Sequence, residues 1–279
     1  MRGLALVAGG SVCLISACMT IPASAQDIVP AAQPADDWDI VRDESTRTTL
    51  AFTAFDNGVS IAFRCIDGSL NSVIAGLPPA EGGRRTMRVS FRGRPAYESG
   101  WTTTTDSTVV VGDFPAPFAR EFRAGGELRL TLPSAGQGGR NVTFVAELPQ
   151  SSTAIDEVLT RCGKPLVDPR DAMLKALGYN GLPEGLTWRR APRPEFPDGR
   201  YGSGFVVTTC VSQSDGSLSD CEIEMEHPHD GRFGRAALRA IEDARIVNSD
   251  APDDAVPIGR VSFRTQFRLE EPRRIRRTR

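Results

Sequence analysis

His227 and His229 are the side chains in this sequence that could most readily bind a metal ion or act as a general base. They flank Pro228 and precede Asp230, and imidazole and carboxylate groups suit zinc or copper. Two histidines so close together cover a narrow arc, and the sequence indicates no third ligand. We interpret the segment as a polar loop before a helix. No nucleophile elbow, phosphate-binding loop or dinucleotide fingerprint occurs, so we expect no catalytic residue, no metal and no cofactor.

The cysteines indicate an oxidising compartment. Of the six in the chain, Cys13 and Cys18 lie in the apolar N-terminal stretch. No two cysteines form a C-x-x-C pair, which argues against zinc binding and thioredoxin-like redox chemistry. An even number in an exported protein predicts disulfides. Four cysteines allow three pairings, and these four are Cys65, Cys162, Cys210 and Cys221.

Residues 1–25 are typical of a signal peptide. Arg2 precedes an apolar run that ends in the small residues Ala23-Ser24-Ala25. We therefore expect cleavage before Gln26 and a periplasmic protein. Two alternatives are a retained membrane anchor and lipidation of Cys18, because Ile15-Ser16-Ala17-Cys18 resembles a lipobox. The net charge of −2 and the predicted export argue against a nucleic-acid partner.

The next segments are predicted to be a disordered lead over residues 26–37 and a mainly-β, sandwich-like domain with short helices over 38–165. Phe114, Phe118 and Phe122 are spaced four apart, which favours a short helix over the core. Alternation of apolar and polar residues identifies the strand candidates, which are 50–54, 59–65, 87–91, 108–111, 127–132 and 142–148.

A second helix is expected after residue 150. Its apolar residues Ile155, Val158, Leu159 and Cys162 recur at helical spacing, which places Cys162 on the buried face. Cys65 lies on the apolar face of its strand. We therefore predict a Cys65–Cys162 disulfide that closes nearly the whole domain.

Residues 166–185 are expected to be a linker that contains one short helix, and a second domain follows over 186–271. Two apolar runs flank Asp215-Gly216, a strong hairpin signal. Centring the turn there places Cys210 opposite Cys221, within disulfide distance. This register predicts one core face, with Met225 on it, and one solvent face that carries acidic residues.

A helical stripe and a last strand complete the second domain. Alanines and Phe233 recur at helical spacing, and residues 260–269 then alternate between polar and apolar. The order ββαβ makes the chain α+β, with the last strand beside the first. We expect the apolar residues of that strand, including Leu269, to face the helix. The basic tail 272–279 is expected to be solvated.

The second domain resembles the TonB C-terminal domain family over residues 190–270. The resemblance rests on the order and spacing of short motifs, which are Pro194, Pro197, Gly204-Phe205-Val206-Val207, Asp215-Gly216, Phe233-Gly234, Ala236-Ala237-Leu238 and Gly259. It implies a module that binds an extended segment of an outer-membrane receptor by β-strand addition. The family's anchor with its functional histidine and its long proline-rich spacer have no counterpart here, so the resemblance does not extend to energy transduction.

The first domain resembles invasion-associated locus B-like and type VI secretion-accessory proteins, through Arg64-Cys65, Trp101, Phe118, Phe122 and Cys162. We expect a non-catalytic module that binds a protein partner in the cell envelope. The alternatives are an envelope or secretion-system structural adaptor and, more distantly, a periplasmic enzyme. The expected binding edge is the polar side of the last strand, formed by Arg260, Ser262, Arg264, Gln266 and Arg268.

Overall fold

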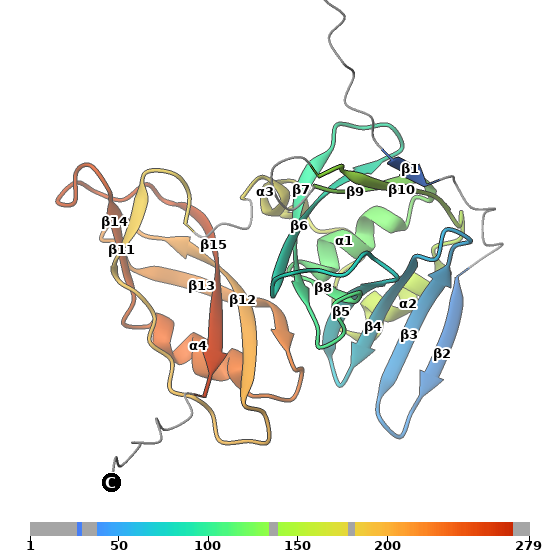
Figure 1. Cartoon of the computed structure of the whole chain (residues 1–279). Helices are drawn as coiled ribbons and strands as arrows, with labels where there is room; N and C mark the ends of the chain where they lie inside the picture. Colours follow the sequence, from blue (N-terminus) through green and yellow to red (C-terminus); the bar gives the residue numbers. More distant parts are fainter. Residues whose placement is uncertain (1–26, 30–37, 134–138, 178–181, 270–279) are drawn as a thin grey trace, which may run out of the picture.

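The computed structural model describes residues 27–29, 38–133, 139–177 and 182–269 (Figure 1). The expected signal peptide, the lipobox at Cys18 and the basic tail lie outside these residues. Of the expected disordered lead, only Asp27–Val29 is described, and it forms the short strand β1, parallel to a strand of the first sheet. Among the described residues, no helix combines the length and hydrophobicity that a membrane crossing requires.

The N-terminal unit is one ten-stranded sheet with two helices. Its strand order is β1-β10-β9-β6-β7-β8-β5-β4-β3-β2, and Figure 1 shows α1 lying between the limbs of the bent sheet. The helices are α1 (Pro115–Phe122) and α2 (Thr153–Arg161). The remaining strands are β2 (Asp39–Asp43), β3 (Thr48–Ala54), β4 (Ser60–Ile66), β5 (Ser69–Ala75), β6 (Arg84–Phe91), β7 (Tyr97–Thr103), β8 (Val110–Gly112), β9 (Gly126–Leu132) and β10 (Val142–Leu148).

The core of this unit is formed by the apolar residues that recur at every second position in the strands and at helical spacing in α1. In β4, every second side chain is buried, from Ile61 through Phe63 to Cys65. Phe118 and Phe122 lie on one face of α1, and the Phe122 ring centroid is 5.1 Å from that of Phe63. Edge-to-face aromatic pairs of this kind add about 0.5–1.5 kcal/mol beyond the area that they bury.

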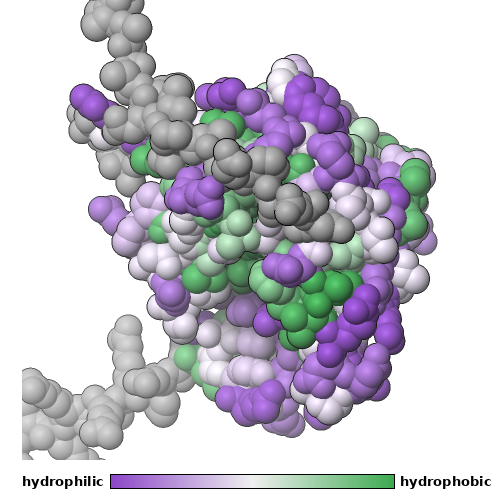
Figure 2. All heavy atoms as spheres, turned by 90° about the vertical axis from the view of Figure 1, so that its right-hand side faces the viewer, coloured by the Kyte–Doolittle hydropathy of each residue, from purple (hydrophilic) through white to green (hydrophobic). Residues whose placement is uncertain are grey.

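The predicted sandwich is a single continuous sheet. Four of its strands, β1, β2, β5 and β7, were not predicted. In β5 and β7 the alternation is obscured because Asn71, Ser72 and Ser99 are polar residues that the fold buries. The terminal strand β2 carries Val41, which is 48 % exposed. Figure 2 looks at this side of the molecule and shows a mainly polar surface, with its largest apolar area below the centre and smaller ones elsewhere.

The structure contains the predicted Cys65–Cys162 disulfide, with a Cα–Cα distance of 5.6 Å. Cys162 follows the last turn of α2, whose buried residues Val158 and Leu159 pack on the sheet. Because Cys162 lies at helical spacing from Val158 and Leu159, its sulfur atom points toward the sheet and reaches Cys65 of β4.

The described part of the expected linker contains the short helix α3 (Asp171–Ala176). Leu174 of this helix is buried, whereas Val167 and Met173 are exposed. Arg120 of α1 donates hydrogen bonds to both carboxylate oxygens of Asp171, at 2.7 Å each. The first part of the expected linker is thus packed against the N-terminal unit.

The C-terminal unit has a three-stranded sheet of order β13-β12-β15 and a two-stranded sheet of β11 and β14. The sequence predicts the order ββαβ, and the structure adds β11 and β14, which are too short for a clear alternation. α4 covers one face of the larger sheet through Phe233, Ala236 and Ala237. The elements are β11 (Leu186–Arg190), β12 (Ser203–Ser212), β13 (Leu218–His227), α4 (Phe233–Ile241), β14 (Arg245–Asn248) and β15 (Gly259–Arg268).

The hairpin of β12 and β13 contains the predicted Cys210–Cys221 disulfide, with a Cα–Cα distance of 4.1 Å. The predicted register holds at Thr208↔Ile223, but it shifts on both sides of the middle of the hairpin. Because a shift of one residue reverses the face of a side chain, Met225 lies on the face opposite α4. The expected position of Met225 in the helix-facing core is therefore wrong.

Candidate protein-interaction edge

β15 is an edge strand along its whole length. It pairs antiparallel with β12 from Ser203↔Arg268 to Ser212↔Gly259, and with no other strand among the described residues (Figure 1). A ten-residue edge strand carries a row of unpaired backbone groups that can accept another strand. The last strand therefore lies where the sequence predicts it, beside the first strand of the hairpin.

The register shows which backbone groups of β15 point outward. Leu269 donates its backbone N–H to the carbonyl of Gly202 at 2.9 Å, which continues the β12–β15 pairing. Antiparallel pairs alternate between hydrogen-bonded and non-hydrogen-bonded positions. The even-numbered residues of β15 therefore direct their N–H and C=O groups away from β12, and these are the predicted edge residues, Arg260, Ser262, Arg264, Gln266 and Arg268.

The side chains of the edge residues divide into two groups. Gln266 and Arg268 are exposed, and Gln266 donates a hydrogen bond to the carbonyl of Gly204 at 3.2 Å. Ser262 is buried, and Arg260 is mostly buried and lies 3.8 Å from Glu222. The exposed part of the predicted edge is therefore its C-terminal end, whereas the side chains nearer the start of β15 are covered.

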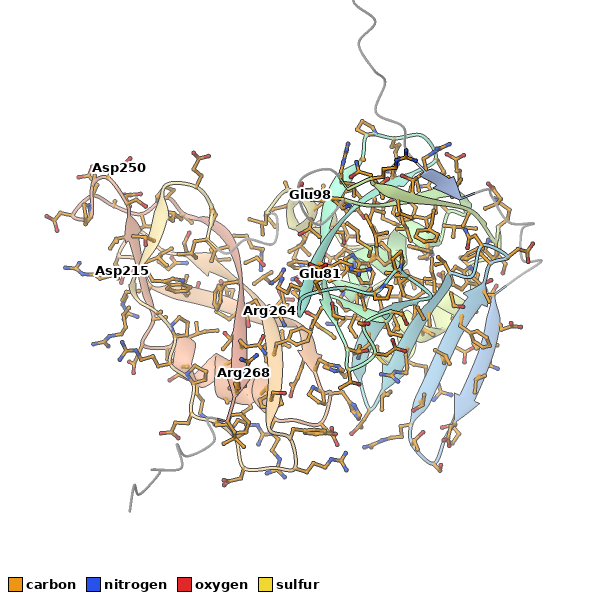
Figure 3. All side chains as sticks on the ribbon, in the orientation of Figure 1. Glu81, Glu98, Asp215, Asp250, Arg264 and Arg268 are labelled. Atoms are coloured by element: carbon orange, nitrogen blue, oxygen red, sulfur yellow. A yellow bond between two sulfur atoms is a disulfide. The ribbon has the colours of Figure 1, made fainter. Side chains whose placement is uncertain are left out.

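Arg264 lies between the two units (Figure 3). Its guanidinium carbon is 4.0 Å from the ring centroid of Phe205. Burial lowers the pKa of Arg264 to about 10, the nearby charge of Asp113 opposes this shift, and that of Arg84 adds to it. The guanidinium remains charged at neutral pH, and a desolvated cation over an aromatic ring contributes about 2 kcal/mol.

Asp113 is the counter-charge that the N-terminal unit provides. It follows β8, is 2 % exposed, and accepts a hydrogen bond from Arg84 Nη2 at 2.8 Å. Burial raises the pKa of Asp113, while Arg84 and Arg264 oppose that rise. A buried carboxylate between two guanidinium groups links β8 and β6 to the last strand.

An apolar cluster forms the rest of this interface. Phe205, Val207 and Met225 of the C-terminal sheet are buried together with Val111, Phe114 and Leu174. The predicted solvent face of the hairpin is therefore an interface. The signal was present in the sequence, because Phe205-Val206-Val207 is a continuous apolar run, which is typical of a strand buried on both faces.

Arg170 fixes the connector to β13. It donates hydrogen bonds to Asp168 at 2.8 Å, to Glu222 at 2.6 Å and to Glu224 at 3.3 Å. Thr209 donates a further bond to Glu224 at 2.6 Å. The hydrogen bond from Arg170 lowers the pKa of Asp168, so both charges persist at neutral pH. Glu222 and Glu224, two of the acidic side chains expected on the solvent face, therefore bind the linker to the C-terminal sheet.

The histidines occupy two different environments. His227 lies against Phe205, with ring centroids 5.7 Å apart, and burial followed by the nearby charge of Arg64 lowers its pKa. His229 lines a groove between the units. Within the described ranges, no three His, Cys, Asp or Glu side chains gather closely enough to hold a metal ion.

No protein-family model matches the chain, and no curated protein matches its sequence. The C-terminal domain of TonB from Pseudomonas aeruginosa is 20 % identical, with 32 % of this chain and 92 % of that chain covered and a TM-score of 0.28. Invasion associated protein B from Bartonella henselae is 16 % identical, with 46 % of this chain and 96 % of that chain covered and a TM-score of 0.35. These are weak likenesses of parts of the chain, and neither assigns a function to it.

Proposed function

We propose that this chain is a non-catalytic, periplasmic protein-binding module whose β15 edge accepts an extended segment of an envelope protein. The observation that carries the proposal is the free backbone edge of β15, ten residues long and paired only with β12 among the described strands. Main-chain hydrogen bonds of β-strand addition would supply affinity, and alternate side chains would supply specificity.

The exposed end of the edge favours an acidic partner. Arg268 is exposed next to the outward backbone groups of β15, whereas Arg260 and Arg264 are engaged by the chain itself. Selectivity for acidic side chains would therefore concentrate at the C-terminal end of the strand. A charged edge residue can also discourage strand pairing, so capture has to be tested directly.

Gln266 is the position for a sharp test. Its backbone N–H points outward and its side chain is exposed. Proline removes an N–H and is tolerated at edge strands, so Gln266→Pro should block strand addition and leave the β12–β15 ladder intact. Gln266→Ala keeps the N–H and serves as the matched control.

The experiment uses the full chain expressed in its own periplasm, with a photocrosslinking amino acid at Arg268. A partner crosslinked in wild type and in Gln266→Ala but lost in Gln266→Pro supports strand addition. Equal crosslinking in a folded Gln266→Pro variant would refute it. Capture only through crosslinkers placed in the N-terminal unit would instead support a structural adaptor.

A further inference from the structure

His227 lies on the face of the C-terminal sheet that packs against the N-terminal unit. It pairs with Phe205 across β12 and β13, and the two ring centroids are 5.7 Å apart. The guanidinium carbon of Arg264, on β15, is 4.0 Å from the centroid of the same phenyl ring. Phe205 is thus in contact with an imidazole and a guanidinium, and it belongs to the apolar cluster that joins the two units.

The charged groups that act on His227 are cations. They are Arg64 of β4 in the N-terminal unit, His229 of the loop that follows β13, and Arg264. The Nε atoms of both arginines are buried and have no hydrogen-bond partner among the described residues. The buried carboxylate of the interface, Asp113, acts on Arg264 and not on His227. Protonation of His227 therefore adds a positive charge to a region that is already cationic and partly removed from water.

Separation of the two units would change the surroundings of His227 in two ways. Burial is the first cause that lowers the pKa of His227, and repulsion from Arg64 is the second. Separation would return the imidazole to water and would also take it away from Arg64, which belongs to the other unit. Both changes favour the protonated ring. The separated form therefore binds a proton at His227 more tightly than the packed form, and by linkage acid favours separation.

Asp113 is a second titratable group of the interface. Burial raises its pKa, and the charges of Arg84 and Arg264 oppose that rise. When the units separate, Asp113 regains water, which lowers its pKa, but it loses Arg264, which raises it. Arg84 remains beside it at 2.8 Å, because both residues belong to the N-terminal unit. The two changes at Asp113 thus oppose each other, whereas the two changes at His227 act in the same direction.

We propose that His227 is an acid-sensitive latch, whose protonation separates the two units and uncovers the sheet face that carries Phe205, Val207 and Met225. The packed form predominates at neutral pH, where the imidazole is uncharged. The open form exposes an apolar surface that the N-terminal unit otherwise covers. Histidine suits this role because its charge changes within the range of physiological pH. The latch does not depend on strand addition at β15, so either proposal can fail alone.

Small-angle scattering of the full chain measures separation as an increase in the radius of gyration between about pH 7.5 and about pH 5. Far-UV circular dichroism of the same samples should stay unchanged, because both units remain folded. The ratio of open to packed molecules should rise by up to about tenfold per pH unit, the limit for uptake of one proton. His227→Gln, which has no titratable ring, should keep its neutral-pH radius over the whole range. His229→Gln is the matched control and should open as the wild-type protein does.

Arg64→Met gives a second test that keeps the histidine. Loss of this guanidinium reduces the repulsion in the packed form, so opening should move to lower pH. The proposal is overturned by a wild-type radius of gyration that does not change with pH, or by equal opening of the wild-type protein and a folded His227→Gln variant. Loss of the dichroism signal together with the increase in radius would also overturn it, because acid would then unfold the chain instead of separating its units. If His227→Gln does not fold, an unshifted opening of Arg64→Met overturns it.

Discussion

The two disulfides should contribute unequally to stability, because they close loops of different length. The cysteines of the Cys65–Cys162 pair are 97 residues apart, and those of the Cys210–Cys221 pair are 11 residues apart. Chain entropy gives about 4.7 kcal/mol for the longer loop and about 2.8 kcal/mol for the shorter one. Removing the first pair with a double alanine substitution should therefore cost about 2 kcal/mol more than removing the second.

Urea unfolding followed by tryptophan fluorescence measures both effects. Trp38 and Trp101 are buried in the N-terminal unit, while Trp188 packs on Phe263 of the C-terminal unit at a centroid distance of 5.1 Å. Variants that keep only Trp101 or only Trp188 report the two units separately. Circular dichroism on the same samples tests whether the units unfold together.

The ranking of the two variants is the decisive result. The reasoning fails if the Cys210→Ala/Cys221→Ala variant loses as much free energy of unfolding as the Cys65→Ala/Cys162→Ala variant. Packing contributes to both values, since Cys65, Cys162 and Cys210 are all buried. Reduction of the wild-type protein breaks both bonds at once without deleting a sulfur atom, so it gives a control for the summed contribution of packing.

Three further predictions concern the interface between the units. Arg264→Met should lower the free energy of unfolding by about 2 kcal/mol through loss of the contact with Phe205. Arg268→Met on the exposed end should change it by less than about 0.5 kcal/mol, and equal urea midpoints for the two variants would contradict this. Because the pKa of His227 is lowered in the folded state, the folded state binds fewer protons at this residue than the unfolded state. The wild-type protein should therefore lose stability relative to His227→Gln as the pH falls through about 6.5. The same difference in urea midpoint between the two proteins at neutral and at acidic pH would refute this. Val207→Asp should place an unpaired carboxylate in the apolar interface and separate the two units. The separation should increase the radius of gyration in small-angle scattering and speed proteolysis of the linker. An unchanged radius of gyration would contradict the packing described above.

The α+β class and the elements with strong periodicity could be predicted from the sequence. β4, α1 and α2 show clear alternation or helical spacing, and the disulfide pairing followed from these patterns. β5 was missed because its buried Asn71 and Ser72 look like loop residues. β11 and β14 span only five and four residues, too few for a period to be recognised.

The candidate edge was predicted in position but not in its surroundings. The alternation in residues 260–269 identifies the strand and its polar side, and the pairing with β12 follows from topology. No local pattern indicates that Asp113, about 150 residues earlier in the sequence, lies beside Arg264. Burial of one polar face depends on how the two units pack, and that packing is specified by contacts distant in sequence. Leu269, expected to face the helix, is 55 % exposed and lies just past the last residue of β15.

The packing of Phe205, Val207 and Met225 against the N-terminal unit has a practical consequence for excision of the C-terminal unit. A fragment beginning near residue 186 would carry an uncovered apolar sheet face next to two edge strands, β13 and β15, each paired on one side only. Such a combination promotes edge-to-edge aggregation and non-specific adhesion. The N-terminal unit therefore serves as a built-in cover that keeps the sheet soluble while β15 stays open, and a transplantable version of the module would first need polar residues at these three positions.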